Sequence, residues 1–192
     1  QFYPSWSSQR AADLAKRFNL PLTKNAKELS RGNRVKLSLI AALAHSPRLL
    51  LLDEPTSGLD PVVRAEVLDA LFEFMADGDK AIFYSTHILS DISRLADELA
   101  FLDNGQIKLR QAKEDLAGQW RKISFRSPGN NLKIEAVTSH KHEGKNHQVI
   151  SSNYEVTLRH LSELGVENVQ EHRMDIDEIA VQILRGENVG DS

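Results

Sequence analysis

The sequence predicts an α/β protein: a parallel sheet with helices on both faces, followed by a smaller α+β unit. Two observations predict this class. Between residues 47 and 100, short apolar strands alternate with helices, which is typical of a three-layer α/β sheet. From about Gly118, strand-like segments are separated by polar loops, and two helices follow them. A chain of 192 residues is long enough for one core of this kind and a second small domain.

The composition is that of a globular protein, with 41% apolar and 27% charged residues. The formal net charge of -3 argues against a nucleic-acid binder and against a polybasic membrane anchor. The chain has no cysteine, which excludes disulfides and thiolate metal sites. Its apolar runs are far shorter than the roughly 20 residues that span a bilayer. The start, "QFYPSWSSQR", lacks both a signal-peptide pattern and an initiator methionine, so we expect the chain to begin partway through a larger protein.

Two helices are expected in the first part of the chain. The first spans residues 8–18 and ends before Pro21. The second begins just after Ser30, runs to about Ala44 and is stopped by Pro47, and its alanine and leucine content favours burial. The apolar face of the first helix consists of Ala11, Ala15 and Phe18.

A strand, a helix and a second strand come next. Leu49–Leu52 form a continuous apolar run, which is typical of a strand that helices cover on both faces. Asp60 and Pro61 make a strong helix start, with an acidic N-cap and a proline in the first turn, and Gly78 closes that helix. Residues 81–86, "AIFYST", are the second buried strand. The stripe of the helix consists of Val63, Val67, Leu71 and Phe74.

The remaining elements are a helix over about residues 88–95, a hairpin and the α+β unit. The hairpin turns at Asn104-Gly105, the favoured two-residue turn. After Gly118 the strands are "KISFRS", "LKIEAVTS" and "HQVISS", and Gly165 stops the first of two helices. The stripes of these helices are Tyr154, Leu158, Leu161 and Leu164, then Ile176, Ile179, Ala180, Ile183 and Leu184.

The first predicted strand ends in two adjacent carboxylates, Asp53 and Glu54. An apolar strand that ends in Asp-Glu is the Walker B pattern, in which the Asp binds Mg²⁺ and the Glu can deprotonate the attacking water. "LLLLDE" alone would also fit a strand end with two solvated acids. The following "PTSGLDP" disfavours that alternative.

The stretch "LLLLDEPTSGLDP" resembles the Walker B and D-loop segments of ATP-binding-cassette (ABC) transporter ATPases. Upstream, "LSRGN" resembles the ABC signature that opens a helix, and downstream, "STH" resembles the switch-histidine segment. Three motifs in the expected order make the resemblance specific. "FYPSW", "STHILSDISRLAD" and "FLDNGQI" also resemble ATPase subunits of ABC-2-type exporters, and the resemblance covers about residues 1–117.

The resemblance implies a role for each matching residue around the strand ends. Asp53 would hold Mg²⁺ through water, and Glu54 would be the general base. His87 would contact the γ-phosphate of ATP and help to hold the attacking water. Asp60 would lie in the D-loop and communicate across a dimer interface.

The signature is expected to serve the ATP of the opposite subunit. Ser30 and Gly32 would bind its γ-phosphate, because a serine hydroxyl, a glycine and a helix N-terminus together make an anion site. Arg31 and Asn33 belong to the same expected ATP-binding segment but depart from the usual pattern, which has glycine and glutamine there. Basic residues at the first of these positions are familiar in exporter subunits, so we do not expect Arg31 to inactivate the protein.

The other histidines are expected to be ordinary surface residues. The tract "HKHEGKNH" resembles a metal-binding segment in composition alone, and we predict that it is a solvated polar loop. These histidines are His45, His140, His142, His147, His160 and His172.

No Walker A loop, G-x-x-x-x-G-K-[ST], is found in the sequence. Its only Gly-Lys pair, Gly144-Lys145, is followed by Asn146 instead of Ser or Thr. In the family this loop lies upstream of the signature. We therefore expect a C-terminal fragment that does not use ATP on its own.

The resemblance implies a partial P-loop NTPase (RecA-like) core with part of the ABC helical subdomain, plus a small C-terminal α+β domain. The expected parts are a partial helical subdomain over residues 1–46, half of the ATPase core over residues 47–117 and an accessory domain over residues 118–192.

The function implied is an ATPase subunit, with ATP and Mg²⁺, that energises an ABC-type exporter. It would form a homo- or heterodimer with a second ATPase subunit and act on transmembrane permease subunits, at the cytoplasmic, inner face of the cell membrane, with no nucleic acid. Two alternatives stay open: a non-transport ABC ATPase of the DNA-repair or translation type, and a degenerate regulatory ABC protein.

Overall fold

The computed structural model describes residues 4–76, 78–129 and 132–185. It divides into two compact units, Gln1–Leu95 and Ala96–Ser192. The predicted division after residues 46 and 117 separates the chain by function, and it stays a prediction.

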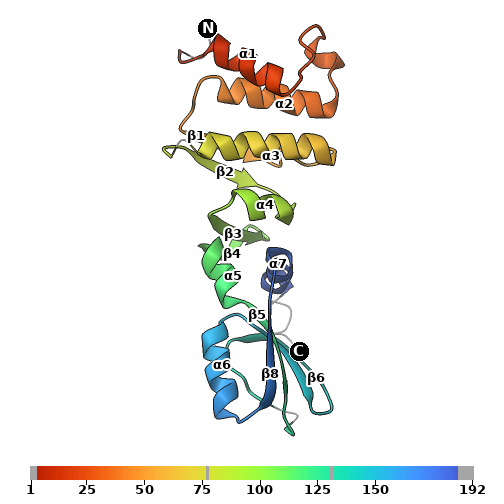
Figure 1. The fold of residues 1–192 in the computed structure, drawn as a ribbon, viewed down its shortest axis with the longest axis vertical. Helices are drawn as coiled ribbons and strands as arrows, with labels where there is room; N and C mark the ends of the chain where they lie inside the picture. Colours follow the sequence, from red (N-terminus) through yellow and green to blue (C-terminus); the bar gives the residue numbers. More distant parts are fainter. Residues whose placement is uncertain (1–3, 77, 130–131, 186–192) are drawn as a thin grey trace. The chain divides into compact units, whose positions relative to one another are not determined.

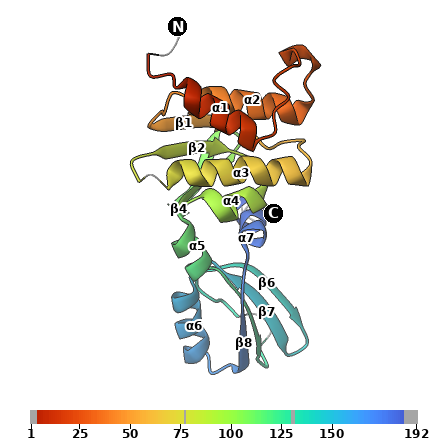
Figure 2. The same ribbon diagram turned by 45° about the horizontal axis from the view of Figure 1, so that its top comes forward.

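The first unit combines helices with a two-stranded parallel sheet, β1–β2, and Figures 1 and 2 show α1 and α2 side by side. The sheet pairs Leu49 with Ala81 and Asp53 with Ser85, so the two strands end together. The elements are α1 (Ser8–Arg17), the 3₁₀ turn η1 (Ala26–Glu28), α2 (Arg31–Leu43), β1 (Leu49–Asp53), α3 (Pro61–Met75), β2 (Ala81–Ser85) and α4 (Leu89–Leu95).

Local sequence signals explain these boundaries. Ser30 caps α2 and Asp60 caps α3, and both side chains accept backbone N–H groups of the first turn. Pro61 occupies the first turn of α3, where its missing N–H costs nothing. The core of the unit consists of apolar side chains from the helices and from one face of the sheet, among them Phe18, Leu39, Ile40, Leu43, Leu50, Val67, Leu71 and Phe74.

The prediction that β1 is buried on both faces is wrong for the described residues. Leu50 is buried, but Leu49 is 54% exposed and Leu51 is 72% exposed. Phe83 on β2 is 68% exposed as well. The core packs on the sheet face that carries Leu50, and within residues 4–76 and 78–95 no helix layer buries the opposite face.

The second unit has two antiparallel sheets, a β3–β4 hairpin and a four-stranded sheet of order β6-β7-β5-β8. Its hairpin turns at Asn104 and Gly105, which both have positive φ, as predicted. The elements are β3 (Glu98–Asp103), β4 (Gln106–Ala112), α5 (Lys113–Gln119), β5 (Arg121–Arg126), β6 (Val137–Glu143), β7 (Asn146–Ser151), α6 (Tyr154–Glu163), β8 (Glu167–Arg173) and α7 (Ile176–Arg185).

Helices α6 and α7 cover different sheets of this unit. Leu161 of α6 packs in a cluster with Ile123, Phe125 and Val149 of the four-stranded sheet. Helix α7 contacts β3 and β4. It buries Ile176 and Ile179 as predicted, whereas Leu184 is 44% exposed and does not belong to the buried face.

The histidine-rich tract is a β-hairpin and not the predicted polar loop. Strands β6 and β7 pair His142 with His147 across a tight turn at Gly144, which has φ +58°. His147 is only 2% exposed. The polar residues around His147 gave no strand pattern in the sequence. Strand β7 forms because it pairs with β5.

No helix in the described part of the chain is both long enough and apolar enough to cross a membrane.

Candidate functional site

The site begins where β1 and β2 end, because parallel strands bring their carboxyl ends to the same edge. Asp53 is the last residue of β1 and pairs with Ser85, the last residue of β2. The Ser85 hydroxyl donates to Asp53 Oδ1 at 2.5 Å, and Glu54 N donates to the Ser85 carbonyl at 3.0 Å. The two strand ends are therefore fixed to each other at the carboxylate pair.

Glu54 and His87 face each other across this edge. His87 Nδ1 lies 2.8 Å from Glu54 Oε1, and the side chains are 70% and 37% exposed for His87 and Glu54. A carboxylate next to an imidazole is an arrangement that can accept a proton from water and orient that water. The structure therefore brings together three predicted residues, Asp53, Glu54 and His87.

The backbone of Glu54 adopts an unusual conformation, with φ +47°. The left-handed region costs a residue with a Cβ about 1 kcal/mol, and such strain is concentrated at functional sites. The hydrogen bond from Glu54 N to Ser85 helps to hold this conformation. The left-handed conformation of Glu54 also turns the chain out of the strand direction immediately after Asp53.

A buried polar network behind the strand ends was not predicted from the sequence. Asp91 on α4 is fully buried and accepts hydrogen bonds from Thr56 Oγ1, from Tyr84 Oη at 2.8 Å and from Arg64 Nε at 2.7 Å. Burial raises the pKa of the Tyr84 hydroxyl well above its ordinary value, which keeps it a donor. The network ties the segment after Glu54 to the helix after His87. The sequence signal that could have revealed this network is Asp91, a charged residue on the apolar face of its helix.

The predicted signature residues lie at the N-terminus of α2. Ser30 is exposed, and its Oγ accepts the backbone N–H of Asn33 at 3.3 Å. Gly32 lies close to α3, because a Cβ at this position would be 3.2 Å from Val63 Cγ1. The start of α2 is therefore exposed to an approaching anion. The missing side chain at Gly32 lets the start of α2 lie close to α3.

Asp60 stands at the N-terminus of α3. Its Oδ1 accepts the backbone N–H groups of Val62 and Val63, each at 3.1 Å. Arg31 reaches from α2 to the loop before Asp60, where its Nη2 donates to the Ser57 carbonyl at 2.7 Å. Predicted residues of the signature and of the D-loop are therefore neighbours within one chain.

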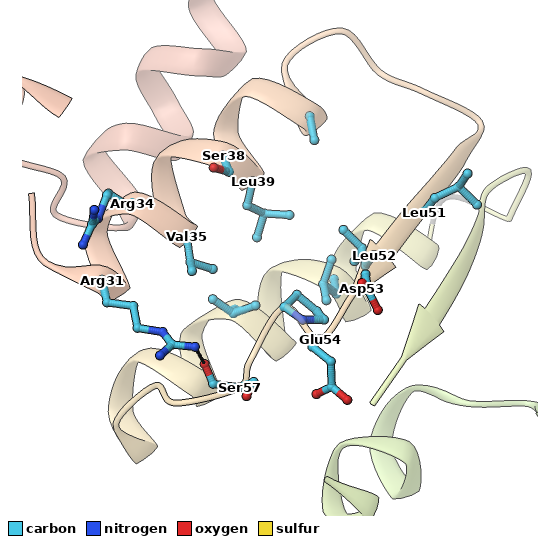
Figure 3. A pocket seen from close by; sticks show the side chains of 14 residues that line it. Arg31, Arg34, Val35, Ser38, Leu39, Leu51, Leu52, Asp53, Glu54 and Ser57 are labelled. Carbon is cyan, nitrogen blue, oxygen red and sulfur yellow. Dashed lines mark hydrogen bonds between the residues drawn. The ribbon is translucent and has the colours of Figure 1, made fainter. Parts of the chain in front are cut away.

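A cavity of about 490 Å³ lies between α2, β1 and α3. Figure 3 shows the side chains that line it. Asp53 and Glu54 line it together with Arg31 and with apolar side chains such as Leu39 and Leu52. The cavity is therefore lined both by the carboxylate pair and by apolar side chains.

The donor set fits Mg²⁺. Mg²⁺ prefers oxygen ligands and is usually held by one or two carboxylates plus phosphates and water. Asp53 supplies an exposed carboxylate next to the Ser85 hydroxyl. Within the residues that the structure describes, no group of three or more His, Cys, Asp or Glu could hold a metal on its own, so further ligands would come from a nucleotide.

Comparison with known proteins agrees with this geometry. The chain is 35% identical over 125 residues to the ABC transporter ATP-binding protein YtrB of Bacillus subtilis, covering 65% of this chain and 43% of YtrB. A solved structure of the ATP-binding subunit of an ABC transporter superimposes with a TM-score of 0.51 at 30% identity, over 57% of this chain and 46% of that one. The chain thus matches the ATP-binding subunits of ABC transporters over more than half of its own length.

The chain is also similar to other ATP-binding proteins. It is 32% identical to the uncharacterized protein MJ1023 of Methanocaldococcus jannaschii, over 70% of this chain and 55% of that protein. It is 36% identical to the daunorubicin resistance protein DrrA3 of Streptomyces coeruleorubidus, over 57% of this chain and 35% of DrrA3. The chain therefore spans about half or less of the length of these relatives.

A family model described as "AAA domain, putative AbiEii toxin, Type IV TA system" matches residues 16–90. This match covers less than half of the chain. It includes the predicted signature, strand β1 with Asp53 and the adjacent Glu54, and His87.

Proposed function

We propose that the chain supplies the carboxylate pair, the switch histidine, the D-loop and the signature of the ATP-hydrolysing subunit of an ABC exporter. The observation that carries this proposal is the Glu54–His87 pair, 2.8 Å apart and next to Asp53 at the ends of two parallel strands. Relatives named for daunorubicin resistance and for lantibiotic transport support a role in transport.

The proposed chemistry assigns each group at the strand ends a role. Glu54 accepts the proton of the attacking water, and His87 holds that water and contacts the γ-phosphate. Asp53 would hold Mg²⁺, which would supply positive charge that neutralises the phosphates. Ser85, which donates to Asp53, keeps that carboxylate in place.

The proposed assembly is a dimer of ATPase subunits on the inner face of the cell membrane, acting on transmembrane permease subunits. Ser30, Gly32 and Asn33 would face the ATP of the opposite subunit, because they open a helix that is separate from the strand ends. Asp60 would lie at the same dimer interface.

The first test titrates Mg-ATP into the purified 192-residue chain. We expect neither micromolar binding nor steady turnover, because the sequence has no loop that cradles the phosphates. Micromolar binding with steady turnover would contradict this expectation.

The second test adds a Walker A loop to the chain. In a protein called here the phosphate-loop chimera, the upstream half of a related ABC ATPase, with its Walker A loop, is joined before Gln1. We expect this chimera to hydrolyse ATP. A folded chimera that binds ATP without hydrolysing it would contradict the proposed catalytic groups.

A further inference from the structure

Arg31, the unusual residue of the signature, spans two segments of the chain that are more than twenty residues apart. Its Cα lies in the first turn of α2, and its Nη2 donates to the Ser57 carbonyl at 2.7 Å. Ser57 lies between Glu54 and Asp60, in the D-loop segment, defined here as residues 55–60. Figure 3 shows this side chain reaching from the helix to the loop.

The guanidinium group also lies against Gly58. A Cβ at Gly58 would be 2.7 Å from Arg31 Nη1 and 2.8 Å from Arg31 Cζ, which is closer than atoms can pack. Gly58 has φ +68°, which other residues adopt at a cost. The absence of a side chain at this position therefore serves both the turn and the approach of Arg31.

The D-loop segment has few other hydrogen bonds that hold its backbone. Ser57 N donates to the Glu54 carbonyl and Leu59 N donates to the Thr56 carbonyl, each at 3.2 Å. These are single turn bonds at the long end of the usual range. The buried Thr56 side chain is also tied to Asp91, and the Asp60 carbonyl accepts Arg64 N at the start of α3. A charge-assisted bond from Arg31 to the Ser57 carbonyl, between these two points, adds a further restraint.

We propose that Arg31 is a positioning residue, which holds the D-loop segment against the start of α2, and not a ligand of the nucleotide. The signature and the D-loop then move as one element, because Gly32 and Val63 also pack together at the two helix starts. The importance of this coupling for hydrolysis rests on the proposed function. The coupling itself does not, because it exists in the chain without nucleotide.

Amide hydrogen exchange in the 192-residue chain tests the coupling. The reporters are the amides of Ser57 and Leu59, whose turn bonds depend on the position of the loop. Arg31→Ala should raise their exchange rates about fivefold, as expected for the loss of one such bond. Arg34→Ala, which removes the same charge one turn along the same helix, should leave them unchanged. Equal exchange rates in the two variants would overturn the proposal.

Gly58→Ala gives a second measurement on the same contact. It should speed exchange strongly in the original chain, because the new Cβ displaces the guanidinium group. In the Arg31→Ala background the same change should have a clearly smaller effect, since only the backbone cost is left. Strictly additive effects would show that the two residues do not act on each other.

The kinetic test uses the phosphate-loop chimera. Arg31→Ala should lower kcat and leave KM for ATP within about twofold, because a positioning residue does not bind ATP. A raised KM with unchanged exchange at Ser57 and Leu59 would make Arg31 a nucleotide ligand and overturn the proposal. Failure of the proposed function would look different, because the unmodified chimera itself would then be inactive.

Discussion

Glu54 is the residue whose position most directly implies chemistry. Its carboxylate faces His87, and its backbone is held in a left-handed conformation by the end of β2. The strain costs stability and has no evident packing benefit, because the side chain is 37% exposed. A geometric role at the strand ends explains why such a conformation is kept.

Glu54→Gln in the phosphate-loop chimera should abolish turnover and leave ATP binding intact. Gln is nearly isosteric but cannot accept a proton from water at neutral pH, so kcat should fall by about 10²- to 10⁴-fold. Steady-state hydrolysis and equilibrium ATP binding are measured on the same preparation. Glu163→Gln on α6 is the control and should keep full activity. Near-normal hydrolysis by Glu54→Gln would show that this residue is not the base.

Ser30→Arg should stop hydrolysis without weakening the ATP affinity of the monomeric chimera. Ser30 opens α2, and its hydroxyl already caps that helix, so arginine adds bulk and charge where a partner's γ-phosphate is proposed to approach. Ser30→Thr keeps the cap and is the control. If affinity and turnover fall together in a folded protein, Ser30 serves its own chain and the assignment across the dimer is wrong.

The β6–β7 hairpin is the element whose character differs most from its sequence pattern. His147 is buried and stacks on Phe125 with ring centroids 5.1 Å apart, and its Nδ1 lies 3.0 Å from His140 Nε2. This contact needs one N–H donor and one unprotonated acceptor nitrogen, so the two rings cannot both carry a positive charge while it is formed. The rings of His140 and His142 are 6.2 Å apart, which adds a third titratable group.

The second unit should therefore lose stability in mild acid. Burial, and then the charges of His147 and His142, lower the pKa of His140 in the folded state. The unfolded state, with an ordinary pKa of about 6.5, then binds more protons, so stability is present above about pH 6.5 and falls as the pH drops below it.

Urea unfolding at pH 7.5 and pH 5.5 measures this effect, with Trp120 as the fluorescent probe in a Trp6→Phe chain. The midpoint should be lower at the acid pH. His140→Gln should reduce the difference, whereas His172→Gln, on the exposed strand β8, should keep it. A midpoint that does not depend on pH would contradict the prediction.

Elements with local signals were predictable from the sequence, and those that depend on partners were not. Asn104-Gly105, Ser30 and Asp60 fix a turn and two helix starts through their own chemistry. Strand β8, Glu167–Arg173, is exposed along its whole length and has no apolar alternation, and it is a strand because it pairs with β5. The seven-residue helix α5 is too short to show a period.

The same distinction applies to the candidate site. The motif residues were predictable because each ends a strand or begins a helix. The Asp91 network and the Arg31–Ser57 contact were not, because they join residues 35 and 26 positions apart. Long-range polar contacts leave no periodic signal in one sequence.

At the scale of the whole chain, the compact units and the predicted functional parts divide at different places. The compact units divide after Leu95, whereas the predicted accessory domain begins at residue 118. Helix α7 contacts β3 and β4, which lie before residue 118. A cut at that position would separate α7 from its contacts with β3, the strand that carries the buried residues Leu99 and Phe101.

Residues 96–192 should therefore fold alone, and residues 118–192 should be markedly less stable. The shorter piece loses the hairpin on which α7 buries Ile176 and Ile179. Chemical denaturation of both pieces, followed by Trp120 fluorescence, compares them directly. Equal midpoints would place the boundary near residue 118, as the sequence predicted.

The exposed face of the β1–β2 sheet has a consequence for calorimetry. Leu49, Leu51 and Phe83 are each more than half exposed to water in the folded chain, so unfolding newly hydrates less of their surface than of a buried side chain. Hydration of apolar surface is what raises the heat capacity on unfolding, by about 12–15 cal/mol/K per residue in ordinary domains. The first unit should show a smaller increment per residue, and therefore a flatter dependence of its stability on temperature. Anything that covers this face would restore the missing increment and steepen that curve.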